Sequence, residues 1–105
     1  MTLHGIDLGT EALGQFCRKW KIRELSVFGS ILRDDFRPES DIDFLVEFEK
    51  DAEWDLFDRM DMEDELAQIV GREIDLVSKS AIEASRNRFY KKEILGTAEP
   101  IHAAG

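Results

Sequence analysis

The stretch LSVFGSILRDDFRPESDIDFLVEF, residues 25–48, carries the pattern that decides the fold of this chain. Alternating apolar side chains predict a strand at 22–28 and a clearer one at 41–48. The Gly29-Ser30 pair ends the first strand, and ten residues separate it from Asp41, which opens an Asp-x-Asp sequence. The stretch therefore predicts a turn after the first strand and two acidic side chains on one face of the second.

The rest of the chain supplies further elements around these two strands. Helices are predicted at 11–20, 55–70 and 81–95, a short helix from Ser30, and a third strand, EIDLV, at 73–77. Thr10 and the capping box Ser80-x-x-Glu83 mark helix starts, and Gly71 suits a helix end. The order predicts one α/β (α+β) domain over residues 1–105, a small mixed β-sheet flanked by helices.

The helical patterns also predict which side chains face the core. In the helix at 55–70, the apolar side chains expected to pack inward are Leu56, Phe57, Met60, Leu66, Ile69 and Val70. The acidic side chains expected to face water are Asp58, Asp61, Glu63, Asp64 and Glu65. In the last helix, Phe89 and Tyr90 are expected to pack against the sheet.

Length and composition limit the class of protein. The chain has 105 residues, of which 43% are hydrophobic and 35% charged, as in a globular domain with one core. It contains no apolar run long enough for a membrane span and no secretory signal at its start, so no membrane contact is expected. Cys17 is the only cysteine, which excludes an internal disulfide and fits a cytoplasmic location. Its place on an apolar helix face predicts a core residue rather than a nucleophile.

The net charge of −9 argues against direct binding of nucleic acid, because an acidic surface repels the phosphate backbone. The charge is also uneven. Residues 39–65, the acidic segment, hold 13 of the 23 acidic side chains and only two basic ones, Lys50 and Arg59. This segment predicts either solvated helix faces or a surface that docks a basic protein partner.

Asp41 and Asp43 are the first candidate metal ligands. Residues two apart on a strand point to the same face, so the two carboxylates repel each other unless a cation lies between them. Carboxylate oxygens suit Mg²⁺, which typically binds one or two carboxylates together with substrate phosphates. A solvated strand edge is the alternative interpretation.

Asp75 is a third candidate ligand, since it interrupts an apolar strand between Ile74 and Leu76. If this strand lies beside 41–48, Asp75 faces the same side as Asp41 and Asp43. Three carboxylates can hold two metal ions in the arrangement that clamps the attacking and leaving oxygens of an in-line displacement. An exposed carboxylate at a strand end is the alternative.

Gly29, Ser30 and Arg33 are candidates for binding an anion. Glycine at the end of a strand lets backbone N–H groups approach a phosphate, and a following helix start adds its dipole. Ser30 can cap that helix or bond a phosphate oxygen. Arg33 can neutralise a triphosphate, or it can be a surface arginine beside Asp34 and Asp35.

Taken together, Gly-Ser, ten residues, Asp-x-Asp and a later aspartate on another strand resemble the nucleotidyltransferase superfamily that includes DNA polymerase beta. The stretch quoted above, followed by GREIDLV, resembles more closely its minimal nucleotidyltransferase (MNT) domains, over nearly the whole chain. The resemblance implies that Gly29 and Ser30 hold a triphosphate. It implies that Asp41 and Asp43 bind two Mg²⁺ (Mn²⁺ being possible), and that Asp75 completes the site and helps deprotonate the acceptor hydroxyl.

The resemblance also implies an activity and a partner. Stand-alone MNT proteins resemble the antitoxin of two-gene pairs whose toxin is a HEPN-domain ribonuclease, and in that family the antitoxin transfers AMP from ATP to a toxin tyrosine. The expected activity is thus protein adenylylation, with ATP as substrate. A non-catalytic antitoxin that neutralises its partner by binding is one alternative. Transfer to a small molecule, through an oligomer, is another. For Tyr90, contact with a base is the alternative to packing against the sheet.

Overall fold

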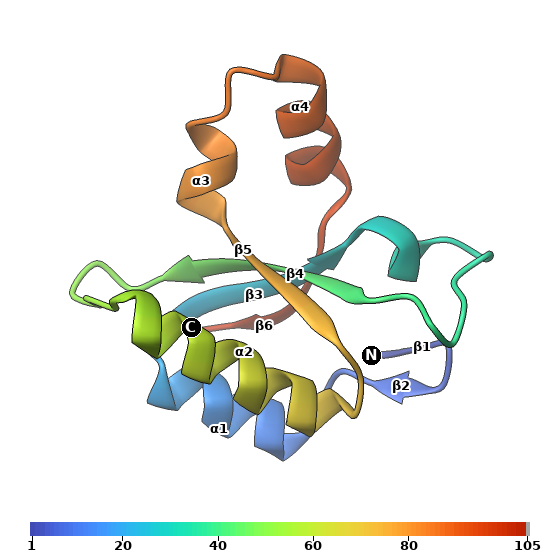
Figure 1. Cartoon of the computed structure of the whole chain (residues 1–105), viewed down its shortest axis with the longest axis horizontal. Coiled ribbons are helices and arrows are strands. Elements are labelled where there is room, and N and C mark those ends of the chain that lie inside the picture. Colours follow the sequence, from blue (N-terminus) through green and yellow to red (C-terminus); the bar gives the residue numbers. More distant parts are fainter. Residues whose placement is uncertain (105) are drawn as a thin grey trace.

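The computed structural model describes residues 1–104, which fold around a four-stranded mixed sheet (Figure 1). Its strands are β3 (Ile22–Phe28), β4 (Ile42–Phe48), β5 (Ile74–Ser78) and β6 (Glu99–Ala103), in the order β5-β4-β3-β6. β4 and β5 are parallel, whereas β3 is antiparallel to both β4 and β6. The predicted fold class, a small mixed sheet with flanking helices, is confirmed.

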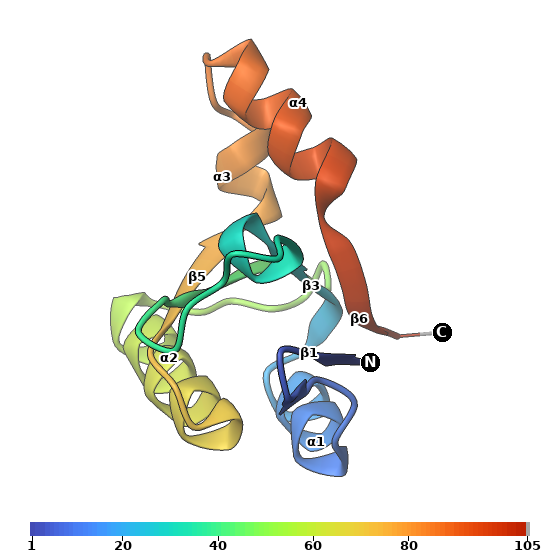
Figure 2. The same cartoon turned by 90° about the vertical axis from the view of Figure 1, so that its right-hand side faces the viewer.

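Helices cover both faces of this sheet (Figure 2). α1 (Glu11–Lys19) and α2 (Leu56–Val70) lie on one face, over the main core. α3 (Lys79–Glu83) and α4 (Arg88–Thr97) lie on the other face, over a smaller core that contains Phe28 and Leu45. The alternation of β4 divides the two cores as predicted, since Phe44 enters the main core and Leu45 the smaller one.

The local signals at the first two long helices act as predicted. The Thr10 hydroxyl accepts a hydrogen bond from the Leu13 amide, which caps α1. Gly71 ends α2 in the left-handed region, at φ +70°. Asp55 and Asp58 form a reciprocal capping box at the start of α2, which was not predicted.

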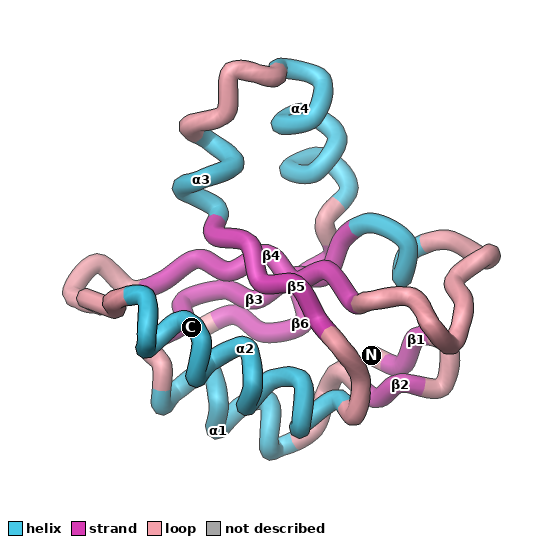
Figure 3. The backbone as a smooth tube through the Cα atoms, viewed as in Figure 1, coloured by secondary structure: helices cyan, strands magenta, loops and turns pink. Residues whose placement is uncertain are grey.

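The C-terminal part differs from the prediction of one helix at 81–95. The Ser78 hydroxyl, rather than Ser80, caps the short α3, and Asn87 starts a separate α4 by accepting from the Tyr90 amide. β6 was not predicted. A short hairpin of β1 (Thr2–Leu3) and β2 (Ile6–Asp7) also precedes α1. Figure 3 shows that helices, loops and a strand alternate at short intervals in the C-terminal part, from α3 through α4 to β6.

Two burial predictions are wrong. At the start of α2, Leu56, Phe57 and Met60 are 71%, 75% and 53% exposed, because Met62 and Leu66 on the opposite side of the helix fill the core. Phe89 is 89% exposed and Tyr90 44% exposed, because the first turn of α4 extends beyond the sheet (Figure 1).

Cys17 is fully buried, as predicted, and burial raises the pKa of its thiol to about 11. A thiol with that pKa remains protonated at neutral pH and is a poor nucleophile. None of the helices in residues 1–104 combines the length and the apolar character needed to cross a membrane.

Candidate active site

Gly29 is held at the end of β3 by two separate constraints. Its φ of +76° lies in the left-handed region, which strongly favours glycine. A β-carbon built on Gly29 would also lie 2.5 Å from Oδ2 of Asp43, which is a steric clash. The turn and the carboxylate are therefore in direct contact, and only glycine allows this closeness.

Ser30 lies in η1 (Gly29–Leu32), a single turn of 3-10 helix. No side chain caps this turn, so the predicted capping role of Ser30 is wrong. The helix dipole expected here is small because the turn has only four residues. Among the described residues, no hydrogen bond engages the hydroxyl of half-buried Ser30, which leaves it available to a ligand.

Asp43 and Asp75 are register partners in the parallel pair of β4 and β5, so their side chains leave the same face of the sheet. Asp41 immediately precedes β4, two residues before Asp43. All three belong to the sheet face covered by α3 and α4. The expectation that Asp75 lies beside the other two is confirmed, although Asp75 is exposed rather than buried.

Asp43 is the half-buried member of this carboxylate group. Burial raises the pKa of Asp43 above its ordinary 3.8, and the negative charges of Asp75 and then Asp41 raise it further. The fold therefore holds Asp43 where its ionised form is disfavoured, and a nearby positive charge would relieve that cost.

The donor set of this group suits Mg²⁺, because all three side chains offer hard carboxylate oxygens and Asp43 is crowded by negative charge. Within residues 1–104, however, no three His, Cys, Asp or Glu side chains are placed so that they alone could hold a metal ion. Mg²⁺ usually takes only one or two carboxylates and completes its shell with water and substrate phosphates. The residues thus fit a metal that binds together with a nucleotide.

The loop that joins Gly29-Ser30 to Asp41 is fixed by residues that the sequence did not single out. His4 Nε2 donates to the Ile31 carbonyl at 2.9 Å, and its ring packs on Phe36 with 4.8 Å between centroids. The guanidinium of Arg72 lies 4.7 Å from the centre of the Phe36 ring. It also donates to the carbonyls of Arg37 and Ser40. The ten-residue spacer is therefore held at its middle and at its end.

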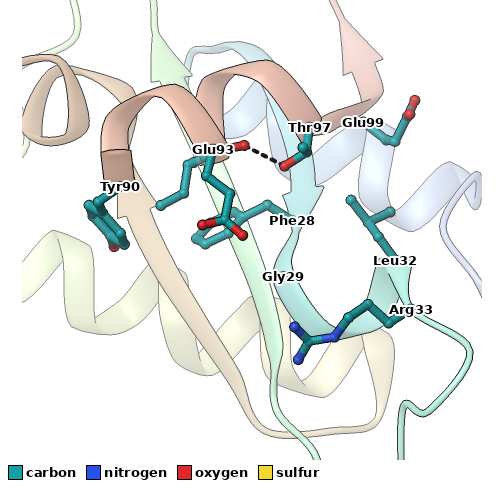
Figure 4. Close-up of a pocket in the computed structure, with 9 residues that line it drawn as sticks. Phe28, Gly29, Leu32, Arg33, Tyr90, Glu93, Thr97 and Glu99 are labelled. Carbon is teal, nitrogen blue, oxygen red and sulfur yellow. Dashed lines mark hydrogen bonds between the residues drawn. The ribbon is translucent and has the colours of Figure 1, made fainter. Parts of the chain in front are cut away.

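A cavity of about 630 Å³ adjoins the Gly29 turn (Figure 4). Its lining residues are Phe28, Gly29, Leu32, Arg33, Tyr90, Glu93, Ile94, Thr97 and Glu99. Arg33 is exposed and pairs with Asp35 at 3.5 Å, yet its side chain extends toward the Gly29 turn. Glu93 and Thr97 were missed at the sequence level because only the tertiary placement of α4 brings them beside β3.

Comparison with known families identifies this arrangement. The family described as nucleotidyltransferase domain matches residues 10–97, which include the turn, the spacer and all three aspartates. The chain belongs to the nucleotidyltransferase domain family. It is therefore a nucleotidyltransferase by family, and the resemblance to this family noted in its sequence is confirmed.

Relatives of this nucleotidyltransferase carry more specific names. It is 38% identical over 76 residues to "Putative protein adenylyltransferase MJ0128" of Methanocaldococcus jannaschii, covering 72% of each chain. It is 31% identical over 77 residues to "Protein adenylyltransferase MntA" of Thermococcus cleftensis, covering 73% of this chain and 76% of the relative.

Solved structures share the fold of this nucleotidyltransferase. A structure described as a "putative minimal nucleotidyltransferase" superposes with a TM-score of 0.68 at 29% identity, over 92% of this chain and 98% of that one. A chain in the "Crystal structure of the toxin-antitoxin with AMP-PNP" superposes with a TM-score of 0.66 over 90% of this chain and 73% of that one. At 18% sequence identity, this match shows only that the two chains share a fold.

Proposed function

We propose that residues 1–105 act as a single nucleotidyltransferase domain that transfers AMP from ATP to a tyrosine hydroxyl of a partner protein. The partner would be a HEPN-domain ribonuclease toxin, and this chain would be its antitoxin. The observation that carries the proposal is the contact of the Gly29 turn with Asp43, which is itself in register with Asp75. The turn proposed to bind phosphate therefore touches one carboxylate, and the second lies beside it on the neighbouring strand.

The proposed step is an in-line displacement at the α-phosphorus of ATP. The tyrosine oxygen forms a bond to that phosphorus, the bond to the bridging oxygen breaks, and pyrophosphate leaves with the electron pair. Asp75 is the proposed acceptor of the hydroxyl proton, because it is exposed and an incoming protein side chain can reach it. Asp41, Asp43 and Asp75 would hold two Mg²⁺ or Mn²⁺ ions, which would stabilise the charge that develops on the phosphate oxygens.

Gly29, Ser30 and Arg33 are the proposed triphosphate ligands. The unengaged Ser30 hydroxyl and the backbone of the turn lie next to Asp43, so phosphates bound there would be close to the carboxylates. Arg33 is the only cation that lines the adjoining cavity within residues 1–104, and it would offset part of the triphosphate charge.

The comparisons support the choice of ATP and of a protein acceptor. Two relatives bear the name protein adenylyltransferase, and a toxin–antitoxin structure with the same fold contains AMP-PNP, an ATP analogue. The acidic segment supports a basic partner. Of its 13 acidic side chains, only Glu47, Asp51 and Glu65 pair with basic side chains among the described residues.

The experiment is to incubate the chain with ATP, Mg²⁺ and the protein encoded by the neighbouring reading frame, and to measure the intact mass of that protein. The expected result is a gain of one or more AMP groups, mapped to tyrosine by fragmentation. Asp43→Asn is the matched control, since it keeps the shape of the side chain and removes its charge. A neighbour that binds this chain but gains no AMP would contradict the proposal.

A non-catalytic antitoxin is the second candidate. It is favoured by the apolar patch of Leu56, Phe57 and Met60, which lies exposed within the acidic segment and would suit a binding surface. Asp41→Asn combined with Asp43→Asn separates the two functions. If the variant still forms the complex but no longer neutralises the toxin, the enzyme is supported. Retained neutralisation would support the binder.

A further inference from the structure

The cavity beside Gly29 is separate from the three candidate metal-binding aspartates, although Gly29 itself touches Asp43. It lies between the end of β3, η1 and the inner side of α4, and none of Asp41, Asp43 and Asp75 lines it. Its volume of about 630 Å³ falls within the range of small-molecule sites. A nucleotide whose phosphates rest on the Gly29 turn would therefore have room to place the rest of the molecule in this cavity.

The walls of the cavity suit a flat, neutral ring. Phe28, Leu32 and Ile94 contribute apolar surface, and Tyr90 adds a second aromatic side chain from the first turn of α4. Phe28 and Ile94 are also members of the smaller core, so this wall is fixed by packing. Bases stack on aromatic side chains in nucleotide sites of many folds.

The polar groups of the cavity are divided by charge. Arg33 lies at the end next to Gly29, whereas the carboxylate of Glu93 extends into the cavity beside Phe28 (Figure 4). Glu99 also lines the cavity, but its carboxylate points away from it (Figure 4). Phosphates would thus be attracted to the Arg33 end and repelled from the Glu93 end.

Glu93 is an exposed residue whose carboxylate is free to accept a hydrogen bond from a ligand. Within residues 1–104, no ion pair and no side-chain hydrogen bond engages this carboxylate. The hydroxyl of Thr97 is already used, because it donates to the backbone carbonyl of Glu93. An ionised carboxylate only accepts hydrogen bonds, so a ligand group that faces Glu93 must donate one.

We infer that this cavity binds the adenine ring of ATP, with Glu93 accepting a hydrogen bond from the exocyclic amino group and Phe28 and Tyr90 contacting the ring. This inference rests on the proposed function, since it takes the triphosphate to lie on the Gly29 turn. Glu93 is then a specificity residue. It favours bases that present an amino group and disfavours uracil, which presents a carbonyl oxygen in the corresponding position.

The test is calorimetric binding of ATP, UTP and purine riboside triphosphate, which is ATP without the amino group, in the presence of Mg²⁺. The wild-type chain should bind ATP more tightly than purine riboside triphosphate by about tenfold or more, the effect of one hydrogen bond to a charged group. Glu93→Ala should bring the two affinities together. Glu93→Gln, which keeps an acceptor oxygen, should retain part of the preference.

Glu99→Ala is the matched control, because it removes the same charge from the rim of the cavity and should leave the preference unchanged. An unchanged preference in Glu93→Ala would overturn the inference even if AMP transfer proceeds. The same holds if Glu93→Ala strengthens the binding of all three nucleotides equally, since Glu93 would then act only by repulsion. A wild-type chain that binds none of the three would overturn both the inference and the proposed function.

Discussion

At the scale of the residue, Gly29 connects the fold to the chemistry. Its left-handed backbone turns the chain after β3, and its missing side chain admits the Asp43 carboxylate. The sequence predicted the turn, because Gly-Ser follows an apolar strand. It could not predict the contact with Asp43, which depends on the pairing of Phe28 with Asp43 across two strands.

Gly29→Ala is expected to reduce both stability and nucleotide binding, because alanine adds backbone strain and displaces Asp43. Gly71→Ala is the control, since Gly71 has a similar φ of +70° but no atom within 4 Å of an added β-carbon. Gly71→Ala should lower the free energy of unfolding by about 1–2 kcal/mol, the strain of alanine in the left-handed region. Thermal unfolding and ATP titration measure the difference. Equal losses of stability with ATP binding retained would contradict the role given to the Gly29–Asp43 contact.

Asp43→Asn is expected to stabilise the metal-free protein at neutral pH. The pKa of Asp43 is raised in the fold, so its protonated form adds stability below the ordinary pKa of 3.8. That contribution is lost as the pH rises through the raised pKa. At pH 7, the asparagine variant should therefore melt at a higher temperature than the wild type.

The difference in melting temperature between Asp43→Asn and the wild type should shrink as the pH falls toward 3.8. Wild-type Asp43 then becomes protonated, so it no longer carries a disfavoured negative charge. Thermal unfolding in EDTA across this range measures it. Asp61→Asn, on the exposed side of α2, is the control for the change in net charge. If Asp43→Asn melts at a lower temperature than the wild type at neutral pH, the view that burial and neighbouring carboxylates destabilise ionised Asp43 would be contradicted.

At the scale of the element, regular segments with clear periodicity were predictable and irregular ones were not. β3 begins and ends where the alternation predicts, and α2 ends at the predicted Gly71. The prediction of which side chains of α2 are buried was wrong at the start of the helix. Apolar residues occur on two sides of that helix, and only tertiary packing determines which side is buried. β6 was missed because its EPIHA sequence, with Pro100, gives a weak strand signal.

The spacer loop is the element on which the site depends most. Phe36 contacts both the His4 ring and the Arg72 guanidinium, so it joins the N-terminal hairpin, the loop and the segment before β5. Phe36→Ala should therefore weaken ATP binding and slow AMP transfer by about tenfold or more, since small misplacements of a site are costly. Hydrogen exchange should rise over residues 33–41 with little change in α1. Unchanged activity with a loosened loop would contradict the positioning role.

At the level of the whole molecule, negative charge is distributed unevenly along the chain. The net charge of −9 is concentrated in the acidic segment, which also exposes Leu56, Phe57 and Met60. Composition predicted the acidic surface, whereas the apolar patch within it emerged only from the fold. An exposed apolar patch and acidic side chains thus occur in the same segment, and protein interfaces combine apolar and polar residues.

Phe57→Ser is expected to leave the melting temperature unchanged, because the side chain is exposed in the free chain. It should weaken the complex with the partner by about 30-fold or more, the effect of losing one interface residue worth about 2 kcal/mol.

Raising the salt concentration should slow association by about tenfold or more, since steering by opposite charges is screened. Binding kinetics measure both. Association that is independent of salt would contradict an electrostatic role for the acidic segment.

In the function proposed for this chain, the Gly29 turn, Asp43 and Asp75 form a site for transfer of AMP to a protein. The most direct measurement is incorporation of label from α-phosphate-labelled ATP into partner tyrosine by the wild-type chain, Asp43→Asn and Asp75→Asn, each shown to bind the partner. We predict labelled tyrosine with the wild type and a loss of about 10²- to 10³-fold in each variant. Labelling that persists in Asp43→Asn, or its absence with the wild type in an intact complex, would contradict the claim.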